Sequence, residues 1–88
     1  MRELVWTNRF ERSAGKFLDK NPGKVEQFKT IIRQMEEDAF HSSLKTHKLK
    51  GKLDGLYACS VSWSHRIVFK VVSGQIVLLN IGDHDEVY

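Results

Sequence analysis

Three side chains near the end of this 88-residue chain have types suited to cleaving RNA without a metal: Arg66, His84 and Tyr88. That reaction needs a base for the ribose 2′-OH, a donor that neutralises the phosphorane and an acid for the departing 5′-oxygen. His84 can take or give a proton near neutral pH, because histidine titrates at about 6.5. Arg66 keeps its charge and presents a planar fork to two phosphate oxygens. Tyr88 can stack on a base or donate through its phenol.

A basic segment precedes these residues. The stretch KTHKLKGK holds His47 and no acid, and its lysines are Lys45, Lys48, Lys50 and Lys52. If the segment is extended, Lys48 and Lys50 fall on one side, where they would hold an RNA backbone. The net charge of +3 is a mild bias that does not by itself indicate a nucleic-acid partner, so the clustering carries the prediction.

Each of these residue types also has an ordinary explanation. A histidine near a terminus and a lysine-rich loop are usually solvated, and an arginine at a strand start often pairs with an acid. A metal site is not indicated, because no tight ligand spacing is found among His47, His65, His84, Asp83 and Asp85. We expect neither a metal nor a cofactor.

Cys59 is the only cysteine, which excludes an intrachain disulfide and favours a reducing compartment. It alternates with apolar neighbours and has no adjacent base, so we expect a buried structural thiol. The residues after Met1 show no signal peptide, and no apolar run is long enough to cross a bilayer. We therefore expect a cytoplasmic protein without a membrane partner.

The elements that must position the polar residues begin with a brief strand at 4–6. Apolar residues at helical spacing predict a helix over 8–20, capped by Thr7 or Asn8, with Glu11 completing a capping box if Asn8 is the cap. Asn21, Pro22 and Gly23 end it, and a second amphipathic helix follows to about residue 39. So short a connection predicts an antiparallel helical hairpin.

The second half of the chain reads as a linker followed by strands. Residues 40–55 lose their period and are predicted to be pinned to the core by Leu44, Leu49 and Leu53. Alternation predicts a strand over 56–63, a turn at 64–65, and a hairpin of strands 67–72 and 76–81. Trp6 and Trp63 are expected to anchor either the core or a partner interface.

This order predicts one α+β domain over residues 1–88, β-α-α-β-β-β, with a helical hairpin packed on a largely antiparallel, twisted four-stranded sheet.

Three segments, LKTHKLKGKLDGLYACSV, HRIVFKV and LLNIGDHDEVY, together resemble the RelE/ParE toxin superfamily of type II toxin-antitoxin systems, in its YafQ-like and YoeB-like branch. The resemblance is specific over residues 44–88 and covers the rest only in element order. It implies a small toxin that enters the ribosomal A site and cleaves mRNA there. It also implies a cognate antitoxin, wrapped over the toxin's surface, as a protein partner.

The resemblance assigns roles to particular positions. Arg66 takes the place of the arginine that stabilises the phosphate, His84 that of the C-terminal catalytic histidine or arginine, and Tyr88 that of the terminal aromatic residue. Lys48 and Lys50 match the basic residues before the sheet.

The chain departs from the family pattern at the general base. Ser64 and His65 stand where YoeB-like and YafQ-like members have a carboxylate, and Ser60 stands where YafQ-like members have a histidine. The general base is therefore not assigned: His84 is the first candidate, and His65 and His47 are the alternatives. The alternative functions are a non-enzymatic ParE-like toxin that inhibits gyrase and an inactive interaction module of the same fold.

Overall fold

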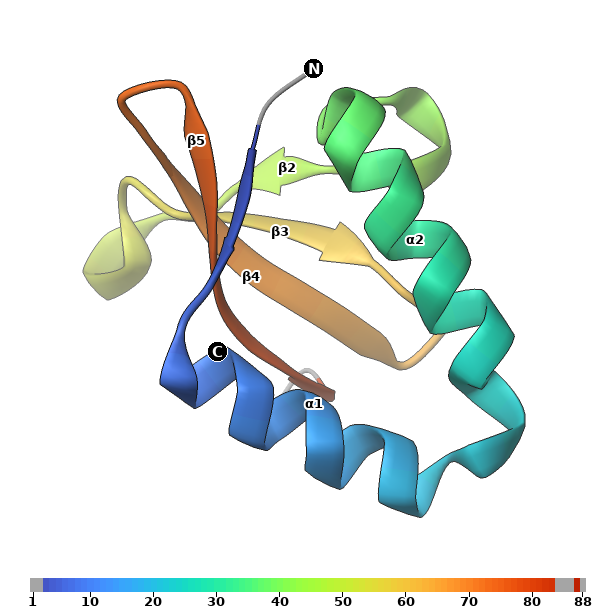
Figure 1. Ribbon diagram of the computed structural model, residues 1–88. Coiled ribbons are helices and arrows are strands. Elements are labelled where there is room, and N and C mark those ends of the chain that lie inside the picture. The colour runs from blue at the N-terminus through green and yellow to red at the C-terminus, as the bar shows by residue number, and fades with distance from the viewer. Residues whose placement is uncertain (1–2, 84–86, 88) are drawn as a thin grey trace.

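The computed structural model describes residues 3–83 and 87, and these form a sheet with two α-helices on one of its faces. Figure 1 shows the elements. In chain order they are β1 (Leu4–Trp6), α1 (Asn8–Lys20), α2 (Val25–Asp38), β2 (His47–Lys48), β3 (Tyr57–Ser60), β4 (His65–Val72) and β5 (Gln75–Asp83). Short 3₁₀ turns lie at Pro22–Lys24, Ser42–Leu44 and Gly51–Leu53.

Helix α1 has the bounds that the sequence predicts, because both of its ends are capped by side chains. Thr7 is the N-cap: its Oγ1 accepts from the Phe10 amide at 3.1 Å and donates to the Leu78 carbonyl at 2.7 Å, which ties the helix to β5. At the other end, the Asn21 side-chain amide donates to the Phe17 carbonyl at 2.9 Å. The prediction left the cap open between Thr7 and Asn8, and the structure selects Thr7.

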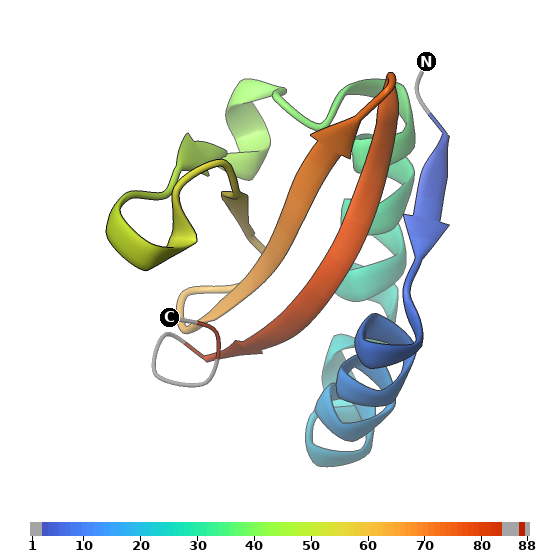
Figure 2. The same ribbon diagram turned by 90° about the vertical axis from the view of Figure 1, so that its left-hand side faces the viewer.

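The two helices are joined by a short turn and splay apart from it (Figure 1), so they do not lie alongside each other over their whole length as a closely packed hairpin would. Phe28 of α2 packs against two rings of α1, with centroid distances of 6.3 Å to Phe17 and 6.5 Å to Phe10. The 3₁₀ turn between them redirects the chain, so a short connection does not bring the helices alongside each other over their whole length. Both helices still lie on the same side of the sheet (Figure 2).

The sheet has five strands in the order β1-β5-β4-β3-β2, so the predicted count of four is wrong. Strand β1 runs parallel to β5, and the other pairings are antiparallel. The extra strand is β2, where His47 pairs with Ala58 and Lys48 with Tyr57. Two residues are too few to show the alternation of a strand, which is why this edge was read as linker.

The strand predicted to run to Trp63 ends at Ser60 instead. The strand does not continue because a turn follows it: the amides of Val61 and Ser62 donate to the His65 carbonyl at 3.0 and 3.4 Å. His65 is accordingly the first residue of β4 and not part of the turn. Trp63 is 95% exposed, which overturns the core alternative for this residue.

Apolar residues pack on both faces of the sheet. The helix face, which carries Ile67 and Phe69 of β4, holds the main core beneath α1 and α2. The outer face, which carries Arg66 and Val68, holds a smaller cluster of Leu49, Ala58, Val68 and Val87. Figure 2 shows the segment around Gly51–Leu53 on this outer side. Leu44 and Leu49 are buried and Leu53 packs against the smaller cluster, so the prediction that these leucines pin the linker is confirmed.

Within the described part of the chain, neither helix combines the length and the apolar character needed to cross a membrane.

Candidate active site

Arg66 lies at the start of β4 in the middle of the sheet, between Ser60 of β3 and Gly82 of β5. Gly82 is buried and adds no side chain to this row of the sheet. The guanidinium is held by the turn before its strand, where Nη1 donates to the carbonyls of Ser62 at 2.9 Å, His65 at 3.0 Å and Trp63 at 3.2 Å.

These three bonds orient the guanidinium without neutralising it. All of them use Nη1 and end on neutral carbonyls, and Arg66 forms no ion pair with any residue between 3 and 83. An arginine held in this way keeps its positive charge and the donors of Nε and Nη2 for an anion. The geometry is suited to binding a phosphate group on the outer face.

His65 precedes Arg66 in the same strand, so its side chain points to the opposite face. Its ring packs edge-on against Phe17 at a centroid distance of 4.8 Å, and its Nδ1 lies 2.9 Å from the Ser62 hydroxyl oxygen. The His65 ring and the Arg66 side chain therefore lie on opposite faces of the sheet, although the Arg66 Nη1 donates to the backbone carbonyl of His65.

His47 lies on the face that carries Arg66. It pairs with Ala58, whose other partner across the sheet is Val68, and directly paired residues share a face. Lys48 pairs with Tyr57 and so belongs to the helix face at the sheet edge.

The basic segment is not one extended strip. Lys45 has a left-handed backbone, with φ of 52°, at the end of a 3₁₀ turn, and Lys52 lies in the next such turn. Lys45, Lys48, Lys50 and Lys52 are all exposed. Only the part from His47 to Lys50 is extended, so the four lysines do not form one continuous row.

The remaining candidates, His84 and Tyr88, lie outside the described residues. Their neighbours in sequence are described. Asp83 ends β5 and pairs with His65, one residue beyond the pairing of Gly82 with Arg66. Val87 is buried in the cluster on the outer face with Leu49 and Val68.

Cys59 is a buried thiol, as predicted, with its Sγ 3.8 Å from the Met35 Sδ. Burial raises the pKa of the thiol to about 12, because the thiolate would lose its hydration. Since only the thiolate is a good nucleophile, Cys59 has no role in covalent chemistry near neutral pH.

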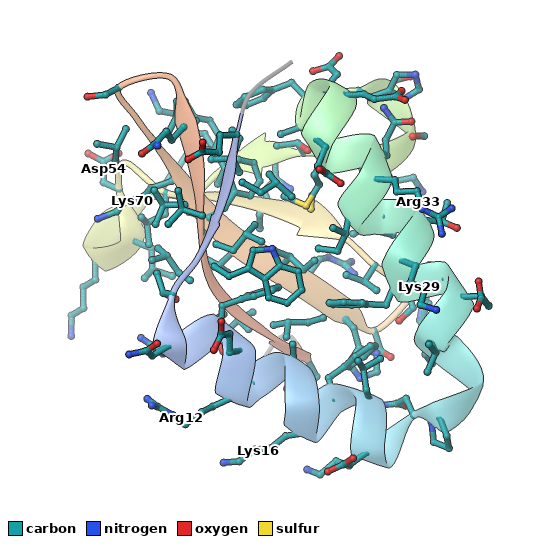
Figure 3. All side chains as sticks on the ribbon, in the orientation of Figure 1. Arg12, Lys16, Lys29, Arg33, Asp54 and Lys70 are labelled. Atoms are coloured by element: carbon teal, nitrogen blue, oxygen red, sulfur yellow. The ribbon has the colours of Figure 1, made fainter. Side chains whose placement is uncertain are left out.

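One feature escaped the reading of the sequence: a pocket of about 250 Å³ on the helix face, between α1 and the ends of β4 and β5. Four cations of α1 line it, together with His65 and other residues; the four are Arg9, Arg12, Lys16 and Lys20. We call this the α1 pocket. Figure 3 shows Arg12 and Lys16 projecting side by side from α1. The spacing of three and four between the cations was the signal available in the sequence.

Solved structures of similar fold include several toxins. YafQ from E. coli strain BL21(DE3) superposes with a TM-score of 0.82 at 13% identity, over 100% of this chain and 99% of that one. A YoeB/ParE toxin from Agrobacterium tumefaciens gives 0.76 at 22% identity, covering 93% and 98%. The toxin in the E. coli DinJ-YafQ toxin-antitoxin complex gives 0.79 at 15% identity, covering 99% and 97%. These likenesses define the RelE/ParE toxin fold.

The family follows from the sequence itself. Residues 2–88 match the family described as the bacterial toxin of the type II toxin-antitoxin system, YafQ. The chain belongs to this family, and its predicted place in the RelE/ParE superfamily is confirmed. A search of curated proteins found no match.

Proposed function

We propose that this toxin is a ribosome-dependent endoribonuclease that cleaves mRNA in the A site. The observation that carries the proposal is the placement of Arg66, a charged guanidinium held by three carbonyls on the outer face, at the start of the central strand β4. A fixed cation that needs no reorganisation during the reaction is what a developing phosphorane charge requires.

In the proposed reaction, a base removes the proton of the ribose 2′-OH and the 2′-oxygen attacks the adjacent phosphorus. The bond from phosphorus to the 5′-oxygen breaks, an acid protonates that oxygen, and a 2′,3′-cyclic phosphate remains. Arg66 binds the non-bridging oxygens and stabilises their added charge. No metal takes part in this scheme.

His84 is the first candidate for proton transfer, because it directly follows Asp83 at the end of the strand that pairs with Arg66. His47 is the second candidate, since it shares the outer face with Arg66. His65 is third, because its ring lies on the helix face against Phe17. Tyr88 is proposed to stack on a base, and Lys45, Lys48, Lys50 and Lys52 to hold the RNA backbone.

We also propose a cognate antitoxin as the protein partner. Two structures of similar fold are complexes of this type, DinJ-YafQ from E. coli and YoeB-YefM from Staphylococcus aureus.

The test is primer extension on a translated mRNA after induction of the toxin. Replacement of Arg66 by Ala is expected to slow cleavage about 100-fold or more, the usual effect of removing one transition-state donor. Arg66→Lys keeps the positive charge but lacks the planar guanidinium that can bind two phosphate oxygens, so it should recover little of the cleavage activity. Arg33→Ala, an exposed arginine of α2, is the matched control and should cleave like wild type.

His84→Ala completes the experiment, and it is expected to reduce cleavage without changing the cut sites. Full cleavage by both the Arg66 and His84 variants would refute the site. Growth arrest with intact mRNA and induced DNA-damage signalling would instead favour the gyrase-inhibiting alternative.

A further inference from the structure

The α1 pocket concentrates positive charge on the face of the sheet opposite Arg66. Its cations follow one another at spacings of three and four, so at 3.6 residues per turn they share one side of the helix. From Arg9 to Lys20 the helix rises about 16 Å, at 1.5 Å per residue. The positive charges therefore form a row along the helix that is long enough to contact several anionic groups of one ligand.

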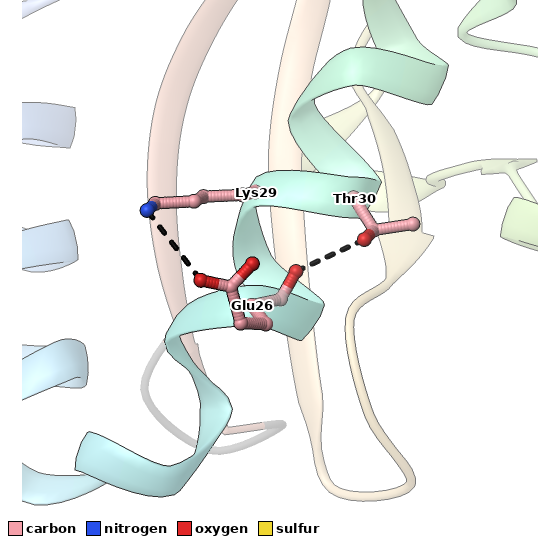
Figure 4. Close-up of polar contacts among 3 residues, drawn as sticks. All are labelled: Glu26, Lys29 and Thr30. Atoms are coloured by element: carbon pink, nitrogen blue, oxygen red, sulfur yellow. Dashed lines mark hydrogen bonds and ion pairs between the residues drawn. The ribbon is translucent and has the colours of Figure 1, made fainter.

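The row is not balanced by acids. None of Arg9, Arg12, Lys16 and Lys20 forms an ion pair with a residue in the described ranges, and the lining of the pocket contains no carboxylate. The nearest acid along the sheet is Asp83, which follows the lining residue Gly82. Helix α2 shows the ordinary alternative, because Lys29 lies 3.6 Å from the Glu26 carboxylate one turn earlier (Figure 4).

The neutral polar groups of the pocket are already used by the fold. Ser13 accepts the Ile81 amide at 3.1 Å and donates to the Phe10 carbonyl at 3.1 Å. Asn21 donates to the Phe17 carbonyl. Two further polar side chains line the pocket: Asn80, whose Oδ1 accepts the Ile81 amide at 3.0 Å, and His65, whose Nδ1 lies 2.9 Å from the Ser62 hydroxyl oxygen. The row of four cations is therefore the main feature that the pocket presents to a ligand, and it recognises negative charge.

The apolar lining residues, Phe17 and Ile81, are already buried, so a bound peptide could bury little additional apolar surface in this pocket. A charged backbone with repeated phosphates fits this description better than an acidic peptide does. Two arginines in the row supply forks that match phosphate oxygens.

We propose that the α1 pocket binds the sugar-phosphate backbone of RNA at a second contact, separate from the Arg66 site. The proposal rests on the function given above in taking RNA as the substrate class. The RNA would be held by charge along α1 while the chemistry takes place on the outer face. The phosphates can come from free single-stranded RNA or from ribosomal RNA.

The test compares two double variants with equal loss of charge, Arg12→Gln/Lys16→Gln on α1 and Lys29→Gln/Arg33→Gln on α2 (Figure 3). Binding of a fluorescent 2′-O-methyl oligouridine, which cannot be cleaved through its 2′-position, is measured by anisotropy over a salt series. The α1 variant is expected to lower the slope of log K against log salt by about 1.4, because each phosphate contact contributes about 0.7. The α2 variant should keep the wild-type slope.

A second arm repeats the comparison with purified 70S ribosomes. A selective effect of the α1 variant on the oligonucleotide assigns the contact to single-stranded RNA, and a selective effect on ribosomes alone assigns it to ribosomal RNA; either supports the proposal. Equal effects of both double variants, or no effect of the α1 variant in either arm, would overturn it. Thermal melts of the variants confirm that each is folded.

The outcome is independent of the cleavage test. If the α1 variant loses phosphate contacts while the wild-type toxin leaves mRNA intact, RNA binding at the α1 pocket is supported and the proposed nuclease activity is refuted. If Arg66→Ala abolishes mRNA cleavage while the α1 variant binds RNA like wild type, the nuclease activity is supported and RNA binding at the α1 pocket is refuted.

Discussion

The two faces of the sheet differ in what they bury and what they leave for a ligand. The helix face carries large, fully buried side chains, including Phe69 and Leu78, which pack against buried residues of the helices such as Phe10. The outer face carries a small cluster around Val68 and, next to it, Arg66. The difference indicates that one face mainly stabilises the fold and the other mainly presents the proposed chemistry.

The change of role takes place between two consecutive residues. His65 and Arg66 differ by one position in β4, yet the period of two along a strand places His65 against Phe17 and Arg66 on the opposite face. A shift of this strand by one residue would exchange them and move the apolar residues of β4 out of the core. The register that builds the core therefore also selects which residue meets the outer surface.

The first test of this comparison makes one substitution on each face. Leu78→Ala removes a side chain that is 0% exposed in the main core, and Leu49→Ala removes one that is 7% exposed in the outer cluster. We expect Leu78→Ala to lower the free energy of unfolding by about 4 kcal/mol and Leu49→Ala by about 2 kcal/mol, within the usual range for this change. Leu49 should cost less because the loop around it can collapse into the space.

Urea denaturation of both variants measures these losses. Equal losses would show that the outer cluster supports the fold as strongly as the main core does, and the proposed division between the faces would be wrong.

The parts of the fold that the sequence predicted are those with several signals in agreement. Helix α1 combined a cap, an apolar period and a terminating Asn-Pro-Gly, and its bounds were predicted correctly. Strand β2 offered two residues and no period, so only its pairing with Ala58 and Tyr57 reveals it. Trp63 continued an alternating pattern, but backbone hydrogen bonds to His65 close a turn that alternation does not report.

The candidate site was predictable to a similar degree. Arg66 was singled out from its residue type and its position at a strand start, and the structure places it as the second residue of β4. Which face it occupies was not predictable, because that depends on which side the helices cover. The cations of α1 were not singled out from the sequence, since only the three-dimensional structure shows β4 and β5 ending beside them.

The second test uses Cys59, a titratable group buried in the main core. Burial raises the pKa of the thiol from 9.0 to about 12, so above pH 9 the unfolded chain releases this proton and the folded chain keeps it. Stability from this group is therefore complete below pH 9 and falls as pH rises toward 12, by about 1.4 kcal/mol for each pH unit.

The measurement is the free energy of unfolding of wild type and of Cys59→Ala at pH 8 and pH 10. The difference between the two proteins should shrink by about 1.4 kcal/mol between these pH values, because alanine does not titrate and the other groups are common to both. A difference that stays constant would show that the thiol is accessible to water and that the helix face is less tightly closed than its packing indicates.

The smallest expected effect concerns the attachment of α1 to the sheet. The Thr7 hydroxyl caps the helix and donates to the Leu78 carbonyl, so it joins the helix layer to β5 with one oxygen. Thr7→Ala should lower the free energy of unfolding by about 1 kcal/mol, the usual effect of removing such a cap. Thr7→Ser keeps the oxygen and should stay within a few tenths of a kcal/mol of wild type.

Thermal denaturation of the two Thr7 variants provides the stability measurement, and primer extension on the same variants shows whether the outer face responds. Because the cap lies in the helix layer and Arg66 is held by the turn at 62–65, we expect Thr7→Ala to lower stability while cleavage by the folded protein is unchanged. A loss of cleavage well beyond the loss of folded protein would show that α1 also sets the geometry of Arg66. The two faces would then be coupled through β5, and the division between stability and chemistry would not hold.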